Sequence, residues 1–349
     1  MERMQEWRTR PGLEGAPAVR DRTVPGRRAV LAASLSAAAR PASSQTGAAE
    51  GWPSRPVRMV VAYPAGGSTD IVGRLLADRL ARLWGQPVVV ENRSGAAGTL
   101  GADAVAKAAP DGHTLLLAAS PELAIARSTQ RDLPYDPVRD FAPVGLLAQS
   151  PFLLLAANAL GVADLRGLVA LAKARPGGLN YASFGNGTSN HLVGELFKAT
   201  AGVDIAHVPY RGSGPMMADL VAGNVQLAFE TIAAGLPHAR SGRVRALGAA
   251  TPRRSALAPD VPTFDEQGFA GFTGGTWIGL VAPARTPAPV VDKIAADLDR
   301  LRADGAFGRE MEERGLVPDS RGPAGFRAFI EAEAAKWGDV AQRAGIVPN

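Results

Sequence analysis

The sequence of 349 residues contains no cysteine. This absence excludes disulfide bonds, thiolate metal sites and a cysteine nucleophile. The chain also lacks a long apolar run, because its weakly apolar stretch at 29–39 has only eleven residues, too few to span a bilayer. With a hydrophobic content of 46% and a mean hydropathy of zero, the composition is that of a globular chain long enough for two domains.

Basic residues are in excess, with a net charge of +5 and a pI near 9.9. Residues 1–50 hold eight arginines and five acidic residues, a net charge of +3, which leaves about +2 for the other 299 residues. Those residues contain no basic run and no alternation of basic with aromatic side chains. We therefore expect no nucleic-acid partner.

Several enzyme motifs are missing as well. The turn at 63–70 has no lysine, as a P-loop requires, and no G-x-G-x-x-G follows the first predicted strand. No G-x-S-x-G nucleophile elbow occurs, which disfavours an ordinary α/β hydrolase. The four histidines, at 113, 191, 207 and 238, do not have the H-x-x-x-H spacing of a metal site. We expect neither a metal nor a cofactor.

Residues 1–50 have the features of an export signal. Two arginines at 27–28 directly precede the weakly apolar stretch at 29–39, a pattern typical of a twin-arginine signal. Small residues near 39 and near 49 both offer cleavage positions, and the sequence does not choose between them. The alternative is an N-terminal helix of the mature fold. We favour export, with residues 1–50 as signal and leader.

From residue 55 onward, apolar strands alternate with helices, which indicates an α/β protein with a largely parallel sheet. Strands are predicted at 57–62, 88–91, 114–119, 144–147, 152–156, 180–183, 205–208, 226–230, 245–250 and 277–282. Helices are predicted at 70–83, up to about 108, and at 165–174, 190–201, 215–222, 288–302 and 324–338. Both α/β cycles carry glycine-rich turns between a strand and a helix. Because ligands of open α/β sheets bind beyond the carboxyl ends of strands, two facing cycles predict a clamshell with a cleft.

The turn after the first predicted strand reads Y-P-A-G-G-S-T-D over 63–70. Small residues let the backbone approach a ligand closely, and the first N–H groups of the next helix have no partner within it. This corner is a natural seat for an anion. Ser68 and Thr69 are either helix caps or ligand contacts, and the two roles are compatible. Asp70 either orders the turn or meets an ammonium group of the ligand.

The second cycle contains further candidates with two readings each. Thr188 and Ser189 start a predicted helix and could cap it or contact a ligand. Arg211 could hold a carboxylate bidentately or form an ion pair within its own lobe. His191 could line the cleft, although packing or capping is the favoured role. Trp277 could cover the cleft or pack at the hinge, and packing is favoured.

Taken together, the motifs resemble those of the periplasmic substrate-binding components of tripartite tricarboxylate transporters, the Bug family. The resemblance starts with W-P-S-R-P-V and runs to the C-terminus through many ordered matches. The matching segments are 52–57, 63–72, 90–101, 110–114, 133–137, 181–188, 207–212, 236–238 and 261–263. The family often has aspartate where Glu230 stands here, and the extra methylene could change the reach of the pocket.

The resemblance implies a type II periplasmic-binding-protein fold with a small carboxylate held between two lobes. Lobe 1 would comprise 51–150 and 280–349, and lobe 2 would comprise 151–279. From lobe 1 the implied ligand residues are Tyr63, Ala65, Gly66, Gly67, Ser68, Thr69, Asp70 and Ser120. From lobe 2 they are Ser183, Gly187, Thr188, Ser189, Tyr210, Arg211 and Glu230.

The implied function is that of an exported, monomeric receptor that delivers a small organic acid to membrane permease subunits from the periplasm. Closure of the lobes would couple affinity to their geometry. A first alternative is a periplasmic sensing partner of a signalling receptor. The second, an enzyme in the same cleft, would need an acid–base pair such as Asp70 or Glu230 with His191.

Overall fold

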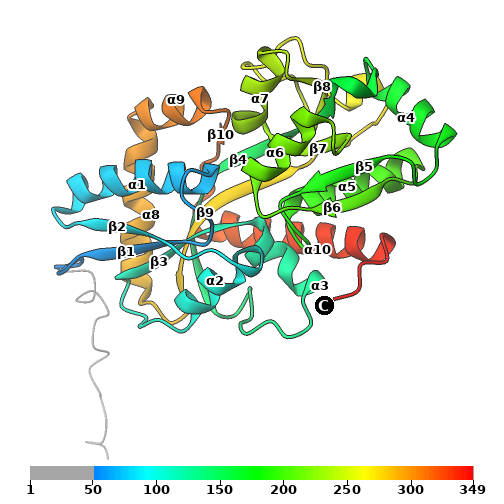
Figure 1. Ribbon diagram of the computed structural model, residues 1–349. Coiled ribbons are helices and arrows are strands. Elements are labelled where there is room, and N and C mark those ends of the chain that lie inside the picture. The colour runs from blue at the N-terminus through cyan, green and yellow to red at the C-terminus, as the bar shows by residue number, and fades with distance from the viewer. Residues whose placement is uncertain (1–50, 349) are drawn as a thin grey trace, which may run out of the picture. The chain divides into compact units, whose positions relative to one another are not determined.

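In a computed structural model, the protein is described over residues 51–348, which lie in one compact unit (Figure 1). The predicted export signal at 1–50 lies outside the described residues. Within 51–348, none of the helices is both long and apolar enough to cross a membrane. The strands follow the order β2-β1-β3-β9-β4-β7-β5-β6, and β8 and β10 also pair with β4. The predicted alternation of strands and helices is confirmed. The predicted largely parallel sheet is wrong, because β4 and β9 make only antiparallel pairs and the sheet is therefore mixed.

The first half of the sheet has a parallel core. It contains β1 (Val57–Val61), β2 (Val88–Asn92), β3 (Thr114–Ala119), α1 (Ser68–Trp84), η2 (Ala96–Gly98) and α2 (Thr99–Ala106). Strand β1 is almost entirely apolar because helices cover both faces of this sheet. Helix α1 buries Val72, Leu76 and Leu80, whose spacing places them on one face. It ends at Gly85, which adopts a left-handed conformation with φ of 65°.

The second half repeats this arrangement with shorter strands. It contains β5 (Asn180–Ser183), β6 (Ala206–Pro209), β7 (Leu227–Thr231) and β8 (Val244–Ala249). Its helices are α4 (Leu165–Ala174), α5 (Ser189–Ala201), α6 (Ser213–Ala222) and α7 (Ile232–Arg240), with short turns η4 (Asn158–Leu160) and η5 (Asp265–Gln267). Strand β5 pairs in parallel with both β6 and β7. Parallel pairing places the carboxyl ends of these strands, and the turns that follow them, at one edge.

Two long strands join the halves, and here one prediction was wrong. We predicted two strands at 144–147 and 152–156, but β4 (Phe141–Ala157) is continuous. It pairs with β9 (Gly275–Pro283) up to Pro151, with β7 from Phe152 onward and with β8 from Leu153 onward. Proline has no N–H to donate, and here it stands where the strand changes partners. The strand therefore passes through a proline that the sequence pattern marked as a break.

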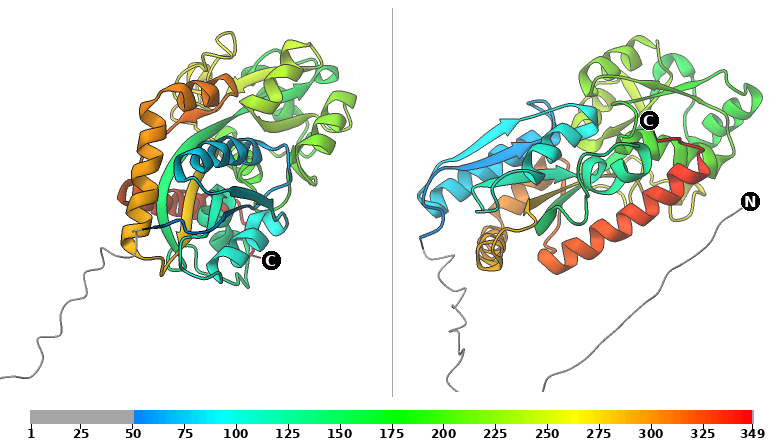
Figure 2. Two further views of the ribbon diagram at one scale, coloured as in Figure 1. Left: turned by 90° about the vertical axis from the view of Figure 1, so that its left-hand side faces the viewer. Right: turned by 90° about the horizontal axis from the view of Figure 1, so that it is seen from below.

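The last elements close the structure on one side. They are α8 (Ala288–Ala303), α9 (Ala306–Glu313), β10 (Val317–Pro318) and α10 (Pro323–Arg343), and η3 (Pro121–Ile125) with α3 (Ala126–Thr129) follows β3. Helix α10, red in Figure 2, packs against β4, η3, α3 and α5 and so contacts both halves. Trp277 is buried against Phe326 and Phe329 of this helix, at ring distances of 5.4 and 5.8 Å. The structure thus places Trp277 in packing, as favoured.

Candidate functional site

The turn after β1 brings exposed backbone to the start of α1. Residues 64–67 are exposed, and Gly66 has a φ of +87°, a conformation that favours glycine. Gly67 is the N-cap of α1, and no side chain among the described residues makes a capping hydrogen bond there. The structure therefore places Ala65, Gly66 and Gly67 at the surface, next to first-turn N–H groups that can face an anion.

Asp70 holds this turn through hydrogen bonds made by its buried side chain. Only 2% exposed, its carboxylate accepts hydrogen bonds from the Gly66 N–H (2.9 Å), the Arg74 guanidinium (two of 3.0 Å) and Asn92 (2.8 Å). Burial acts to raise the pKa of Asp70, but the bonds from Arg74, Gly66 and Asn92 outweigh it and hold the pKa below its ordinary value. Asn92 also donates to the Tyr63 carbonyl (3.0 Å). Of the two roles open for Asp70, this geometry favours ordering of the turn.

Hydroxyl groups from three elements meet between the two halves of the sheet. Ser120 Oγ, after β3, lies 2.6 Å from Ser189 Oγ at the start of α5 and 2.9 Å from Thr276 Oγ1 of β9. Thr276 and Ser150 are register partners in β9 and β4, and the buried Ser150 Oγ has no hydrogen-bond partner in the described chain. The structure thus brings together Ser120 and Ser189, which are 69 residues apart, and adds Thr276 and Ser150, which the sequence reading missed.

The turn after β5 is held by its own side chains. Ser183 Oγ lies 2.6 Å from His207 Nε2 and accepts a hydrogen bond from the Gly185 N–H (3.0 Å). The Thr188 hydroxyl donates to the Gly185 carbonyl (2.6 Å) instead of capping α5. Ser183 and Thr188 therefore fix the loop that leads to the first turn of α5.

His191 supports the same loop from inside. Its Nδ1 accepts a hydrogen bond from the Gly187 N–H (3.2 Å), and its ring stacks on that of His207 at 4.1 Å. Burial lowers the pKa of His191, and burial together with the neighbouring imidazole lowers the pKa of His207 to about 3, so both rings are neutral near pH 7. Gly187 has a φ of +73°, and a Cβ there would stand 2.9 Å from Thr129 Oγ1. The packing role of His191 is the one that the geometry favours.

Glu230 lies at the end of β7, and its carboxyl group is 1% exposed. It accepts hydrogen bonds from the Ser213 hydroxyl, the Thr231 N–H (2.7 Å) and the Thr231 hydroxyl (3.0 Å). Burial raises the pKa of Glu230 to about 7, although these bonds oppose the shift.

The Tyr210 hydroxyl donates to Asp219 (2.7 Å). Arg211 is exposed, and its side chain has no hydrogen bond or ion pair within residues 51–348.

Another buried carboxyl group, Glu122, was not among the residues predicted from the sequence. It is fully buried in η3, accepts hydrogen bonds from the Tyr63 hydroxyl (2.5 Å) and the Ala119 N–H (2.6 Å), and burial raises its pKa to about 7. No local pattern indicates its side-chain partner, since Tyr63 lies 59 residues away in the chain. A glutamate in an apolar segment, P-E-L-A-I, is the sequence feature that could have drawn attention to it.

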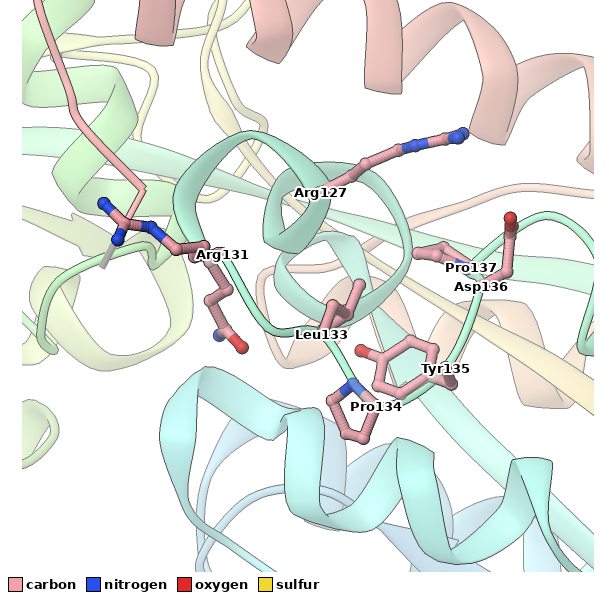
Figure 3. Close-up of a pocket in the computed structure, with 8 residues that line it drawn as sticks. Arg127, Arg131, Leu133, Pro134, Tyr135, Asp136 and Pro137 are labelled. Atoms are coloured by element: carbon pink, nitrogen blue, oxygen red, sulfur yellow. The ribbon is translucent and has the colours of Figure 1, made fainter. Parts of the chain in front are cut away.

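The described chain also has two hollows. One of about 480 Å³ is lined by Arg127, Arg131 and 133–137, and Figure 3 shows the two guanidinium groups pointing apart. Another, of about 930 Å³, adjoins the hydroxyl cluster at Thr276 and is also lined by Trp277 and residues of 250–257, α9 and α10. Neither is lined by a predicted ligand residue. Residues 51–348 also contain no group of three His, Asp or Glu side chains that could hold a metal ion.

Comparisons with known proteins identify the family. Residues 72–346 match the family described as the tripartite tricarboxylate transporter family receptor. Protein BugT of Bordetella pertussis is 38% identical over 298 residues, which cover 85% of this chain and 91% of BugT.

Solved structures of similar proteins match the fold. An R. palustris protein with adipate is 36% identical at a TM-score of 0.81, and the match covers 85% of this chain and all of that one. MatC from Rhodopseudomonas palustris, with bound malate, is also 36% identical, with a TM-score of 0.76 and coverage of 83% and 99%. The periplasmic binding protein BugD is 34% identical with a TM-score of 0.78, covering 85% and 100%. The predicted periplasmic-binding-protein fold is confirmed.

Proposed function

This protein belongs to the tripartite tricarboxylate transporter receptor family, and from this premise we propose that it binds a small dicarboxylate between the starts of α1 and α5. It is a solute-binding receptor rather than an enzyme, as the family is. The observation that carries the proposal is the 2.6 Å contact between Ser120 and Ser189, which links the carboxyl edges of the two halves of the sheet.

The chemistry of this place suits carboxylates. Helices α1 and α5 have 17 and 13 residues, and each directs unpaired N–H groups and the positive end of its dipole toward its N-terminus. Hydroxyl groups of Ser68, Thr69 and Ser189 lie in these first turns. Two helix starts on opposite sides fit a ligand with two acidic groups, and adipate and malate, bound by relatives of 36% identity, are such ligands.

We assign the contacts to two lobes, 51–150 with 280–349 and 151–279. The first would contribute the turn at 63–70 and Ser120, and Asp70 orders that turn without touching the ligand. The second would contribute backbone and hydroxyl groups from 183–189. Arg211 would close on one carboxylate, because its exposed guanidinium is engaged by no other side chain of the described residues. Tyr210 and Glu230 would shape the far end of the pocket.

Export and delivery complete the proposal. The arginine pair at 27–28 supports export through a twin-arginine signal, with the mature receptor in the periplasm. The family description supports membrane permease subunits as partners. We propose that the receptor itself is a monomer. Loss of dicarboxylate uptake on deletion of the gene would separate transport from sensing.

A thermal-shift panel of adipate, malate, citrate, glutamate and benzoate tests the ligand. A dicarboxylate at about 100 times its dissociation constant should add roughly 2.7 kcal/mol of stability. Ser120→Ala with Ser189→Ala should reduce this shift, whereas Thr200→Ala, at the other end of α5, should not. If neither adipate nor malate raises the melting temperature while citrate or benzoate does, the proposed ligand class is wrong.

A further inference from the structure

Glu122 connects the turns that follow the strands of the first half of the sheet. One carboxylate oxygen accepts the N–H of Ala119, the last residue of β3, at 2.6 Å. The other accepts the hydroxyl of Tyr63, in the turn after β1, at 2.5 Å. The Glu122 carbonyl in turn accepts the hydroxyl of Tyr135 at 2.7 Å. One buried side chain thus ties two of the turns to which the proposed function assigns the ligand.

A third turn, after β2, packs against Glu122 and Tyr63. Gly98 has a φ of +91°, and a Cβ there would stand 2.8 Å from Glu122 Oε2 and 3.1 Å from the Tyr63 hydroxyl. No side chain larger than hydrogen fits this position without moving the pair. The turns after β1, β2 and β3 therefore meet at a single carboxyl group.

We propose that Glu122 is a positioning residue of the ligand site, whose ionised carboxylate holds the turn at 63–70 against the end of β3. This inference rests on the proposed function, because it concerns the same site. Glu122 is fully buried and does not reach a ligand in this geometry. It acts through Tyr63 and Ala119, so its loss should change the order of the turn and the affinity together.

The hydrogen bonds of Glu122 suit the ionised form, whereas its burial makes that form costly. In this geometry both partners donate to its oxygens, so an ionised carboxylate accepts both bonds, whereas a protonated acid would have to turn its own O–H toward the Tyr63 oxygen. The other titratable groups near it are Tyr135 and, beside Tyr135, Asp103 of α2, and neither supplies a positive charge. Burial raises the pKa of Glu122 to about 7. A buried charge without a neighbouring cation destabilises the fold, and such groups are typical of functional sites.

Glu122→Gln separates positioning from plain structural support. Glutamine keeps the volume and accepts the Ala119 N–H, but it no longer presents a charge to Tyr63. We expect adipate to bind on the order of 10-fold more weakly, as loss of a charged hydrogen bond would produce. Tyr63→Phe should weaken adipate binding to a similar extent, and the double variant should be little weaker than either single one. At pH 8 the Glu122→Gln variant should melt at a higher temperature than the wild type.

Asp297→Asn is the matched control. Asp297 is a buried carboxylate on α8 that accepts hydrogen bonds from Trp84 (2.9 Å) and Lys293 (2.8 Å), at the end of α1 remote from the ligand turn. Its loss should lower the melting temperature and leave adipate affinity unchanged. If Glu122→Gln instead melts lower at pH 8 and keeps full affinity, as the control does, Glu122 is only structural and the inference is wrong.

Hydrogen exchange gives a readout that needs no ligand. Protection factors of the hydrogen-bonded amides of Gly66 and Ile71 should fall by about 10-fold in Glu122→Gln and stay unchanged in Asp297→Asn. In the wild type they should fall between pH 8 and pH 6 as Glu122 takes up a proton, and this dependence should vanish in the glutamine variant. Unchanged protection in Glu122→Gln would overturn the inference. If adipate fails to bind even the wild type, the dicarboxylate proposal fails, while the exchange comparison still decides the role of Glu122.

Discussion

Glu230→Gln should stabilise the protein at alkaline pH. The carboxyl group of Glu230 is 1% exposed, and its hydrogen-bond partners, Ser213 and Thr231, are neutral. Glutamine preserves all three bonds, because its carbonyl can accept both bonds from Thr231 while its amide donates to the Ser213 oxygen. The substitution therefore removes a buried charge without opening a cavity.

The magnitude follows from the raised pKa. A pKa of about 7 in the folded protein against an ordinary 4.5 means that the folded state holds the proton more tightly than the unfolded chain. The contribution of Glu230 to stability is therefore highest below pH 4.5, falls as pH rises through this interval, and is lower above pH 7 by roughly 3 kcal/mol. For a folded unit of roughly 300 residues this corresponds to a melting-temperature gain of about 5 °C for Glu230→Gln.

The assay is calorimetry of wild type and variant at pH 4 and pH 8. The gain should be present at pH 8 and absent at pH 4, where the wild-type acid is protonated in both states. Glu266→Gln is the control with the opposite sign, because hydrogen bonds from the Thr263 N–H and Arg254 lower the pKa of exposed Glu266. It should lose stability at pH 8. A Glu230→Gln protein that melts lower than the wild type at pH 8 would refute the reasoning.

Three further substitutions test other parts of the structure. Asp70→Asn should lower the free energy of unfolding by on the order of 1 kcal/mol at pH 7 and by less at pH 3, because the lowered pKa of Asp70 makes its ionised form stabilising. The loss is modest because Arg74, its partner, is 56% exposed. Equal losses at both pH values would contradict this. Gly98→Ala should lower the free energy of unfolding by about 1–3 kcal/mol and so lower the urea midpoint, because a φ of +91° is strained for alanine. Gly279→Ala should cost about 1–3 kcal/mol in the same assay, because a Cβ would stand 2.2 Å from the Phe326 ring; wild-type midpoints would refute both.

Apolar periodicity predicted most of the helices and strands because it is a local property of the chain. The predicted helix at 165–174 coincides with α4 (Leu165–Ala174), and the predicted strand at 114–119 coincides with β3. Helix α7 (Ile232–Arg240) was missed because Pro237 stands inside it, and α9 (Ala306–Glu313) was missed because only two of its side chains are buried. The break predicted inside β4 was wrong for a different reason. A proline interrupts a strand only where a partner strand needs a backbone N–H at that position. The arrangement of strands in the sheet determines whether it does.

The family motifs and the glycine-rich turns were readable from the sequence by itself, because each is a run of neighbouring residues with a fixed backbone requirement. They were enough to name the family, the fold and the turns at 63–70 and 183–189. Only the tertiary structure decided which buried side chains contact those turns. Ser120 meets Thr276 across 156 residues, and Tyr63 meets Glu122 across 59. Such pairs leave no local pattern, since burial and hydrogen bonding of a polar side chain depend on what the fold packs against it.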